Sequence, residues 1–264
     1  MNIKKRLSSL SKLFGLDLGM SLESFLALPL FLKQLKQFRK SYSKHAGGWA
    51  WGKLYPCLND FENDENVAKG HYFHQDIIIA RRILERNPKR HADIGSRIDG
   101  FVSHVAVFRE IEVFDIRPLE TDENNIIFRQ ADFMKPINRE FIGKFDSVSC
   151  LHVLEHFGLG RYGDSIDYNG HRNGLSNLAS LLEKDGILYL SVPMGKRRIE
   201  FNAHRVFSIS YLVNMCEEYF RVLRFSYVDD MGSLFENVST TSDEAKNNYN
   251  CVYGCAILEL QKRQ

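Results

Sequence analysis

The sequence predicts an α/β fold built around a mostly parallel sheet, and three observations support this. Its 264 residues, 44% hydrophobic and 26% charged, can bury one full core with an appendage. From residue 65 onward, strand-like runs alternate with helical runs, the order that gives parallel strands joined by crossover helices. Acidic residues follow several strand-like runs directly, at the sheet edge where such folds bind ligands.

Turn residues bound the expected helices. The first begins near Phe73 and stops at Asn87-Pro88, because proline cannot continue a helix. Further helices are expected over residues 99–108, 173–186 and 208–220, with Gly186 as a stop signal.

The expected strands are short runs rich in β-branched and aromatic residues. They cover residues 90–95, 110–118, 125–133, 145–150, 187–193, 221–229 and 251–260. The last two are expected to pair as a hairpin. The polar stretch between them, residues 233–250, is expected to be a mobile insertion.

Charge and cysteine usage exclude some classes of function. The net charge of +2 and the lack of an arginine-rich run argue against a nucleic-acid partner. The five cysteines have no framework spacing, which predicts reduced thiols and a cytoplasmic location. Cys251 and Cys255 lie in an apolar run, so we expect them to pack in the core.

The N-terminal segment is expected to be a helical extension, residues 1–64, before a domain of residues 65–264. Its basic start is not followed by an apolar run with a cleavage site, so we expect no signal peptide. Apolar residues at helical spacing within residues 21–40 predict a helix, which Pro29 should confine to a start near itself. This helix would dock on the domain or on a second subunit of a homodimer, or alternatively make peripheral contact with a membrane.

Three strand ends carry the candidate ligand contacts. Gly95 and Ser96 follow Asp93 in a turn after the first strand. Asp115 ends the second strand, where its carboxylate can accept both ribose hydroxyls of a nucleoside. Asp132, after the third strand, can accept the exocyclic amine of an adenine. Ile116 or Phe133 would cover a face of the ring.

The motif HxxEH, formed by His152, Glu155 and His156, matches the spacing of inverted zinc peptidases. Three glycines that follow it limit the helix to under about two turns, since each costs roughly 1 kcal/mol inside a helix. No later acidic residue is marked as the missing ligand. We therefore expect no metal here, and a zinc hydrolase is the least favoured of the functions considered.

Several strings in order resemble the class I S-adenosylmethionine-dependent methyltransferases over roughly residues 70–260. They are "ADIGS", "VFDIRP", "RQADF", "FDSVSCLHVLEH" and "GILYLSVP". A second set resembles a narrower branch, a domain of unknown function associated with the modification of sugars and polysaccharides. Its strings are "GHYFHQD", "DIGSRIDGF", "HVLEHFGLGRYGD" and "FNAHRVFS".

The resemblance implies a Rossmann-like, seven-stranded methyltransferase sheet with a C-terminal antiparallel hairpin, preceded by an N-terminal helical segment. It implies S-adenosyl-L-methionine as cofactor and S-adenosyl-L-homocysteine as product, with Tyr72 and His152 among the cofactor contacts. The family's turn carries three glycines, whereas only Gly95 is in place here. Ser96 and Arg97 would then accommodate the methionine portion, although Arg97 can equally face outward.

The same resemblance assigns the acceptor side. His156 would face the acceptor, and Glu155 would anchor the turn. A base with a pKa near neutrality suits an alcohol acceptor, which favours His156 or His204, with Asp164 as orienting partner or alternate base. Four residues would contact the substrate, the two later arginines through phosphate: Arg161, Tyr162, Arg198 and Arg205.

We therefore expect a methyltransferase, acting by O-methylation on a sugar, nucleotide-sugar or polysaccharide precursor. The alternative is a methyltransferase-like binding or scaffold protein without the reaction. A nicotinamide dehydrogenase does not fit, because the G-x-G-x-x-G fingerprint is absent after the first strand.

Overall fold

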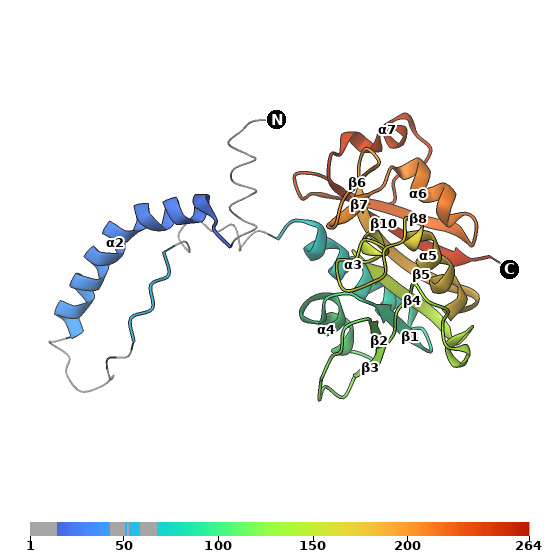
Figure 1. Ribbon diagram of the computed structural model, residues 1–264, viewed down its shortest axis with the longest axis horizontal. Coiled ribbons are helices and arrows are strands. Elements are labelled where there is room, and N and C mark those ends of the chain that lie inside the picture. Colours follow the sequence, from blue (N-terminus) through green and yellow to red (C-terminus); the bar gives the residue numbers. More distant parts are fainter. Residues whose placement is uncertain (1–14, 43–50, 52, 59–67, 264) are drawn as a thin grey trace. The chain divides into compact units, whose positions relative to one another are not determined.

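The computed structural model describes residues 15–42, 51, 53–58 and 68–263 (Figure 1). By contact density the chain divides into two compact units, Met1–Val67 and Ala68–Gln264, which are described separately. The expectation about a signal peptide concerns the first residues of the chain, most of which lie outside the described part.

The first unit contains the helix α2 (Leu18–Tyr42). Asp17 precedes it and accepts hydrogen bonds from the backbone N–H groups of Gly19 and Met20 at 2.9 and 3.2 Å, which satisfies donors that a helix start leaves unpaired. The expected start near Pro29 is wrong, since the helix runs through this proline. In the described parts of the chain, no helix has the length and apolarity needed to cross a membrane.

The second unit is built on one mixed sheet, and the predicted fold class is confirmed. The strand order is β3-β2-β1-β4-β5-β10-β8-β9, and the first five strands in this order are parallel. These five strands are β3 (Ile126–Gln130), β2 (Ile111–Asp115), β1 (His91–Ile94), β4 (Phe145–Leu151) and β5 (Leu182–Met194). A helix was expected over residues 173–186, but the observed helix ends at Leu181, and β5 begins at the next residue, Leu182.

The C-terminal strands are antiparallel, as predicted. Strand β10 (Gly254–Lys262) lies between β5 and β8 (Phe220–Val228). The two-residue strand β9 (Leu234–Phe235) extends the expected seven strands to eight. Strand β9 belongs to residues 233–250, which were expected to be a mobile insertion. This stretch is instead folded, and the ring of Tyr249 stacks on that of Tyr227 with the ring centroids 4.5 Å apart. Two short helical turns complete this stretch, α7 (Asp243–Lys246) and η5 (Asn248–Asn250).

Helices cover both faces of the sheet (Figure 1). On one face α3 (His71–Arg86), the π-helical turn η2 (Ile98–Val102) and α4 (Ser103–Ala106) bury an apolar cluster against β2, β5 and β10. On the other face α5 (Gly170–Leu181) and α6 (Ile209–Cys216) bury a second cluster. Single 3₁₀ turns, η3 (Arg139–Phe141) and η4 (Leu154–His156), precede and follow β4. A small separate ribbon pairs β6 (Arg198–Glu200) with β7 (His204–Val206).

Candidate active site

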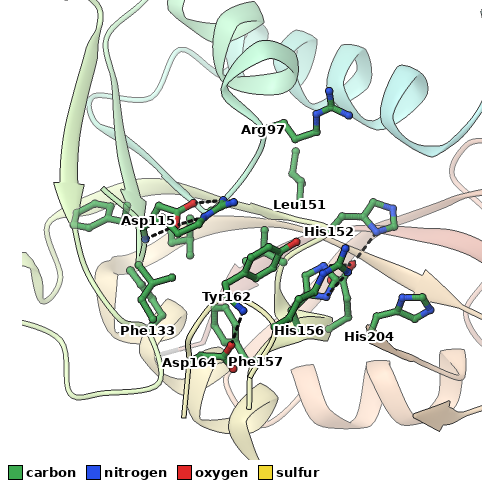
Figure 2. A pocket seen from close by; sticks show the side chains of 18 of the residues that line it. Arg97, Asp115, Phe133, Leu151, His152, His156, Phe157, Tyr162, Asp164 and His204 are labelled. Atoms are coloured by element: carbon green, nitrogen blue, oxygen red, sulfur yellow. Dashed lines mark hydrogen bonds and ion pairs between the residues drawn. The ribbon is translucent and has the colours of Figure 1, made fainter. Parts of the chain in front are cut away.

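A cleft of about 640 Å³ opens at the carboxyl ends of β1, β2, β3 and β4 (Figure 2). Its size suits a small-molecule ligand. Most of the predicted site residues line it, namely Tyr72, Gly95, Arg97, Asp115, Ile116, Asp132, Phe133, His152, His156, Arg161, Tyr162, Asp164 and His204. Four predicted residues are not among those that line the cleft: Asp93, Ser96, Arg198 and Arg205.

The turn after β1 is held from inside the protein. Gly95 has a φ of +67°, and a Cβ atom there would lie 2.8 Å from Cγ1 of Val153. Only glycine fits both the backbone and the space. The Asp93 carboxylate is fully buried and accepts bonds from the backbone N–H and hydroxyl of Ser96 at 3.0 and 2.7 Å. Asp93 and Ser96 therefore shape the turn, a different role from the predicted contact with a cofactor.

Asp115 ends β2 at the cleft, with 15% of its side chain exposed. Its carboxylate is already engaged by Arg117, which donates from Nε at 3.0 Å and from Nη2 at 2.7 Å. The backbone N–H of Arg117 adds a third bond at 2.8 Å. A ribose must therefore use the remaining acceptor positions of Asp115 or displace the guanidinium.

The third strand end supplies an apolar wall with one carboxylate. Phe133 is buried and packs edge-on against Phe114, with ring centroids 5.7 Å apart. Asp132 accepts from the backbone N–H of Met134 at 3.0 Å and forms an ion pair with Lys135 at 3.3 Å. Each carboxylate oxygen of Asp132 thus already has one partner, so the predicted adenine contact would have to use a remaining acceptor position.

The two histidines of the HxxEH motif make different contacts, and their rings lie at separate places along the cleft wall (Figure 2). His152 Nδ1 lies 2.9 Å from Glu155 Oε1. His156 Nδ1 donates to the backbone carbonyl of Ala203 at 2.7 Å. Because His152 lies before the short 3₁₀ turn that contains Glu155 and His156, the two histidines are not presented on one face of a sustained helix.

His156 has the chemical properties of a general base. Its Nδ1–H is used by Ala203, so Nε2 carries the lone pair, and this atom lies 3.7 Å from Glu155 Oε1. Burial lowers the pKa of His156 below its ordinary value, with Glu155 acting in the opposite direction. The ring is therefore neutral near pH 7, and the carboxylate can stabilise the imidazolium that forms when the base accepts a proton.

His204 faces the same side of the cleft from β7. Its Nε2 lies 3.0 Å from Glu200 Oε2, and its ring lies 5.1 Å from that of Tyr253. Burial raises the pKa of Tyr253 to about 12, so its phenol stays protonated. Tyr253 in turn contacts His71, whose pKa is lowered to about 4 by burial and by the neighbouring His152.

The loop after the motif is fixed by one carboxylate and one guanidinium. Asp164 accepts from the backbone N–H groups of Gly158, Gly160 and Tyr162 at 2.8, 3.1 and 3.2 Å. These bonds hold the loop, while Asp164 also lines the cleft, and its predicted role as orienting partner or alternate base stays a prediction. Arg205 is 5% exposed and donates to the carbonyl oxygens of four residues of the turn and loop, Glu155, Phe157, Asp167 and Tyr168.

The other predicted arginines have distinct positions. Arg97 lines the cleft but pairs with Asp99 at 2.8 Å. Arg161 lines the cleft and donates to Ala203 at 3.0 Å. Arg198 pairs with Glu200 and borders a second hollow together with Arg205, so neither lines the main cleft.

The model of a family described as "Caenorhabditis protein of unknown function, DUF268" matches residues 112–256. This segment runs from β2 into β10, and it contains Asp115, the HxxEH motif and His204. The chain belongs to the DUF268 family. A comparison with curated proteins gives no match.

Solved structures resemble the DUF268 chain in fold. The N-methyltransferase NodS from Bradyrhizobium japonicum WM9 is 10% identical, with 75% of this chain and 100% of that chain covered and a TM-score of 0.50. The 1,6-didemethyltoxoflavin-N1-methyltransferase from Burkholderia thailandensis is 12% identical, with 90% and 91% covered and a TM-score of 0.50. The [4+2]-cyclase SpnF is 15% identical, with 76% and 85% covered and a TM-score of 0.51. The fold of this DUF268 member is thus that of the class I methyltransferases.

Several residues that line the cleft of the DUF268 chain were not predicted from the sequence. Arg117 follows Asp115 by two positions at one strand end, so its spacing could have identified it. His71, Phe157 and Tyr253 also line the cleft. Tyr253 precedes the last strand, and no local pattern connects it with His71 at the start of α3.

Proposed function

We propose that the chain is an S-adenosylmethionine-dependent methyltransferase that methylates a hydroxyl of a sugar-containing acceptor. The observation that carries the proposal is the cleft at the strand ends, in which Gly95, Asp115 and Phe133 line one side and His156 and His204 line the other. The Burkholderia thailandensis neighbour was crystallised with bound S-adenosylhomocysteine, which supports the same cofactor class here.

The roles of the residues follow from their chemistry. Asp115 would accept the ribose hydroxyls, and Asp132 beside Phe133 would receive the adenine. The sulfonium is already activated, so the protein must align the acceptor and exclude water. His156 would take the hydroxyl proton at Nε2 as the carbon–oxygen bond forms, and the buried Glu155 carboxylate would stabilise the resulting imidazolium.

The acceptor class is inferred from the side chains beside the histidines. Tyr162 presents an aromatic face, and the guanidinium groups of Arg117 and Arg161 lie 4.7 and 5.2 Å from its ring centroid. A ring that can stack on a sugar, next to two cations that can pair with phosphate, suits a nucleotide-linked or phosphorylated sugar. Arg117 and Arg161 take over the phosphate role predicted for Arg198 and Arg205.

Calorimetry with S-adenosylhomocysteine tests the cofactor assignment. Asp115→Asn should weaken binding at least tenfold, since each charge-assisted bond contributes about 1.5 to 3 kcal/mol. Asp122→Asn, on the exposed connection after β2, is the matched control and should bind as the wild type does. Equal affinity in Asp115→Asn and wild type would contradict the placement of the ribose.

Methyl transfer is then tested with methyl-labelled S-adenosylmethionine and a pool of nucleotide-sugars. Label should enter a sugar-containing product with the wild type but not with Asp115→Asn. Tight cofactor binding without label transfer to any acceptor would favour the non-catalytic binding protein.

A further inference from the structure

Three potential metal ligands meet at one wall of the cleft. They are His71 at the start of α3, His152 directly after β4, and Cys255 in β10. One ligand atom from each lies within 4.8 Å of the other two. The rings of His71 and His152 are parallel within 3°, with centroids 5.3 Å apart. Three elements distant in sequence thus bring together two imidazoles and a thiol.

His152 has an unsatisfied nitrogen in this cluster. The residue is 8% exposed, and its Nε2 is buried without a hydrogen-bond partner in the part of the chain that the structure describes. Native proteins rarely keep a buried polar atom without a partner, so this nitrogen calls for an explanation. The backbone of His152 also has a φ of +55°, an unusual conformation for a side chain of this size.

The opposite nitrogen of the same ring is oriented by a carboxylate. His152 Nδ1 lies 2.9 Å from Glu155 Oε1, and Glu155 is 1% exposed. With Nδ1 engaged by the carboxylate, Nε2 is the nitrogen available to an ion, which would displace any proton bound there. This carboxylate–histidine arrangement is how proteins fix the tautomer and orientation of a metal-binding imidazole.

We propose that His71, His152 and Cys255 form a binding site for a borderline-soft divalent ion, with Zn²⁺ as the preferred occupant. Two imidazoles and one thiolate select ions of this class over Mg²⁺ or Ca²⁺. Bond lengths of about 2.0 to 2.3 Å place tetrahedral ligand atoms roughly 3.3 to 3.8 Å apart, so the three side chains need to close by at most about 1.5 Å.

The proposed site keeps one coordination position for another ligand. Three protein ligands plus a water or small molecule is the composition of catalytic zinc sites, whereas structural sites use four protein ligands. His71 and His152 both line the cleft, so an ion held by them would lie at its wall. The site differs from the HxxEH pair, because its ligands are His71, His152 and Cys255 and do not include His156. It does not depend on methyl transfer, since it is tested by ion binding alone.

The test is a titration of chelator-treated full-length protein with Zn²⁺, followed by Co²⁺ as a spectroscopic probe. We expect one Zn²⁺ per chain and, with Co²⁺, a thiolate-to-metal charge-transfer band. His152→Ala and His71→Gln should abolish stoichiometric binding, and Cys255→Ser should remove the charge-transfer band. Glu155→Gln should weaken Zn²⁺ binding by about 10- to 100-fold.

Two matched variants distinguish this site from the alternatives. His156→Gln tests the HxxEH pair, and Cys251→Ser tests a neighbouring buried thiol; both should retain one Zn²⁺ per chain. Circular dichroism checks that each variant is folded. If Cys255→Ser does not fold, the result for His71→Gln, a substitution at a partly buried helix start, decides between the outcomes. No stoichiometric Zn²⁺ in the wild type would overturn the proposal. So would binding that survives His71→Gln but is lost in His156→Gln.

Discussion

Acid should destabilise this protein through His91, at the start of β1. The ring is 1% exposed, with Nδ1 2.8 Å from the hydroxyl of Ser147 and Nε2 3.2 Å from that of Ser149. Burial, and to a lesser degree the charge of Arg109, lowers the pKa of His91 from 6.5 to about 3. Below pH 6.5 the unfolded chain therefore binds a proton that the folded protein does not, and the free energy of unfolding falls as the pH falls from 6.5 towards 3.

The magnitude follows from the two pKa values. The full difference corresponds to roughly 5 kcal/mol at the acid limit, at about 1.36 kcal/mol per pH unit. Between pH 7 and pH 5 the loss is about 2 kcal/mol, large against a total stability of roughly 5 to 15 kcal/mol. Asp93 contributes with the opposite sign. Burial raises its pKa from 3.8 to about 6, so the folded state takes up that proton first as the pH falls.

Urea denaturation of wild type and His91→Gln at pH 7 and pH 5 isolates the contribution of His91, because Asp93 is present in both proteins. Glutamine cannot titrate, so His91→Gln should be the less stable protein at pH 7 and should lose about 2 kcal/mol less than the wild type on acidification. An equal loss in both proteins would refute the assignment of this pH dependence to His91.

Three further outcomes are expected. Gly95→Ala should lower the free energy of unfolding, measured by urea denaturation, by at least about 1 to 2 kcal/mol and should weaken cofactor binding. Gly143 has a similar φ but open space around it, so Gly143→Ala should cost only the strain of the backbone conformation. Equal effects of the two substitutions would contradict the contact with Val153. His156→Ala or His204→Ala should lower the rate of methyl transfer at least tenfold while leaving cofactor affinity within about threefold of the wild type. In the wild type the rate should rise with pH through an apparent pKa below 6.5, because burial lowers the pKa of His156. Full activity in both variants would exclude a histidine base. Arg205→Met should lower the free energy of unfolding by about 3 kcal/mol or more, because it leaves backbone carbonyl groups without a donor. A change of less than about 0.5 kcal/mol in urea denaturation would contradict the structural role of Arg205.

The sequence by itself determined the order of the elements and most of the residues that face the cleft. Short runs rich in β-branched and aromatic residues, bounded by turn residues, mark the strands, and parallel strands bring their carboxyl ends to one edge. Asp115, Asp132 and His152 could therefore be assigned to one crevice without coordinates. Gly95 could be assigned to a tight turn because no other residue adopts its backbone conformation at such low cost.

The tertiary structure alone decided what each polar side chain contacts. Asp164, Arg198 and Arg205 looked like site residues in sequence, yet Asp164 and Arg205 hold a loop through backbone groups, and Arg198 borders another hollow. Such partners are set by loop geometry, which local periodicity does not encode. The cluster of His71, His152 and Cys255 has no sequence pattern either, because α3, β4 and β10 bring it together across 184 positions of the chain, from 71 to 255. The sequence thus gives the chemical type of each side chain, whereas the packing of distant elements decides which side chains come together in a site.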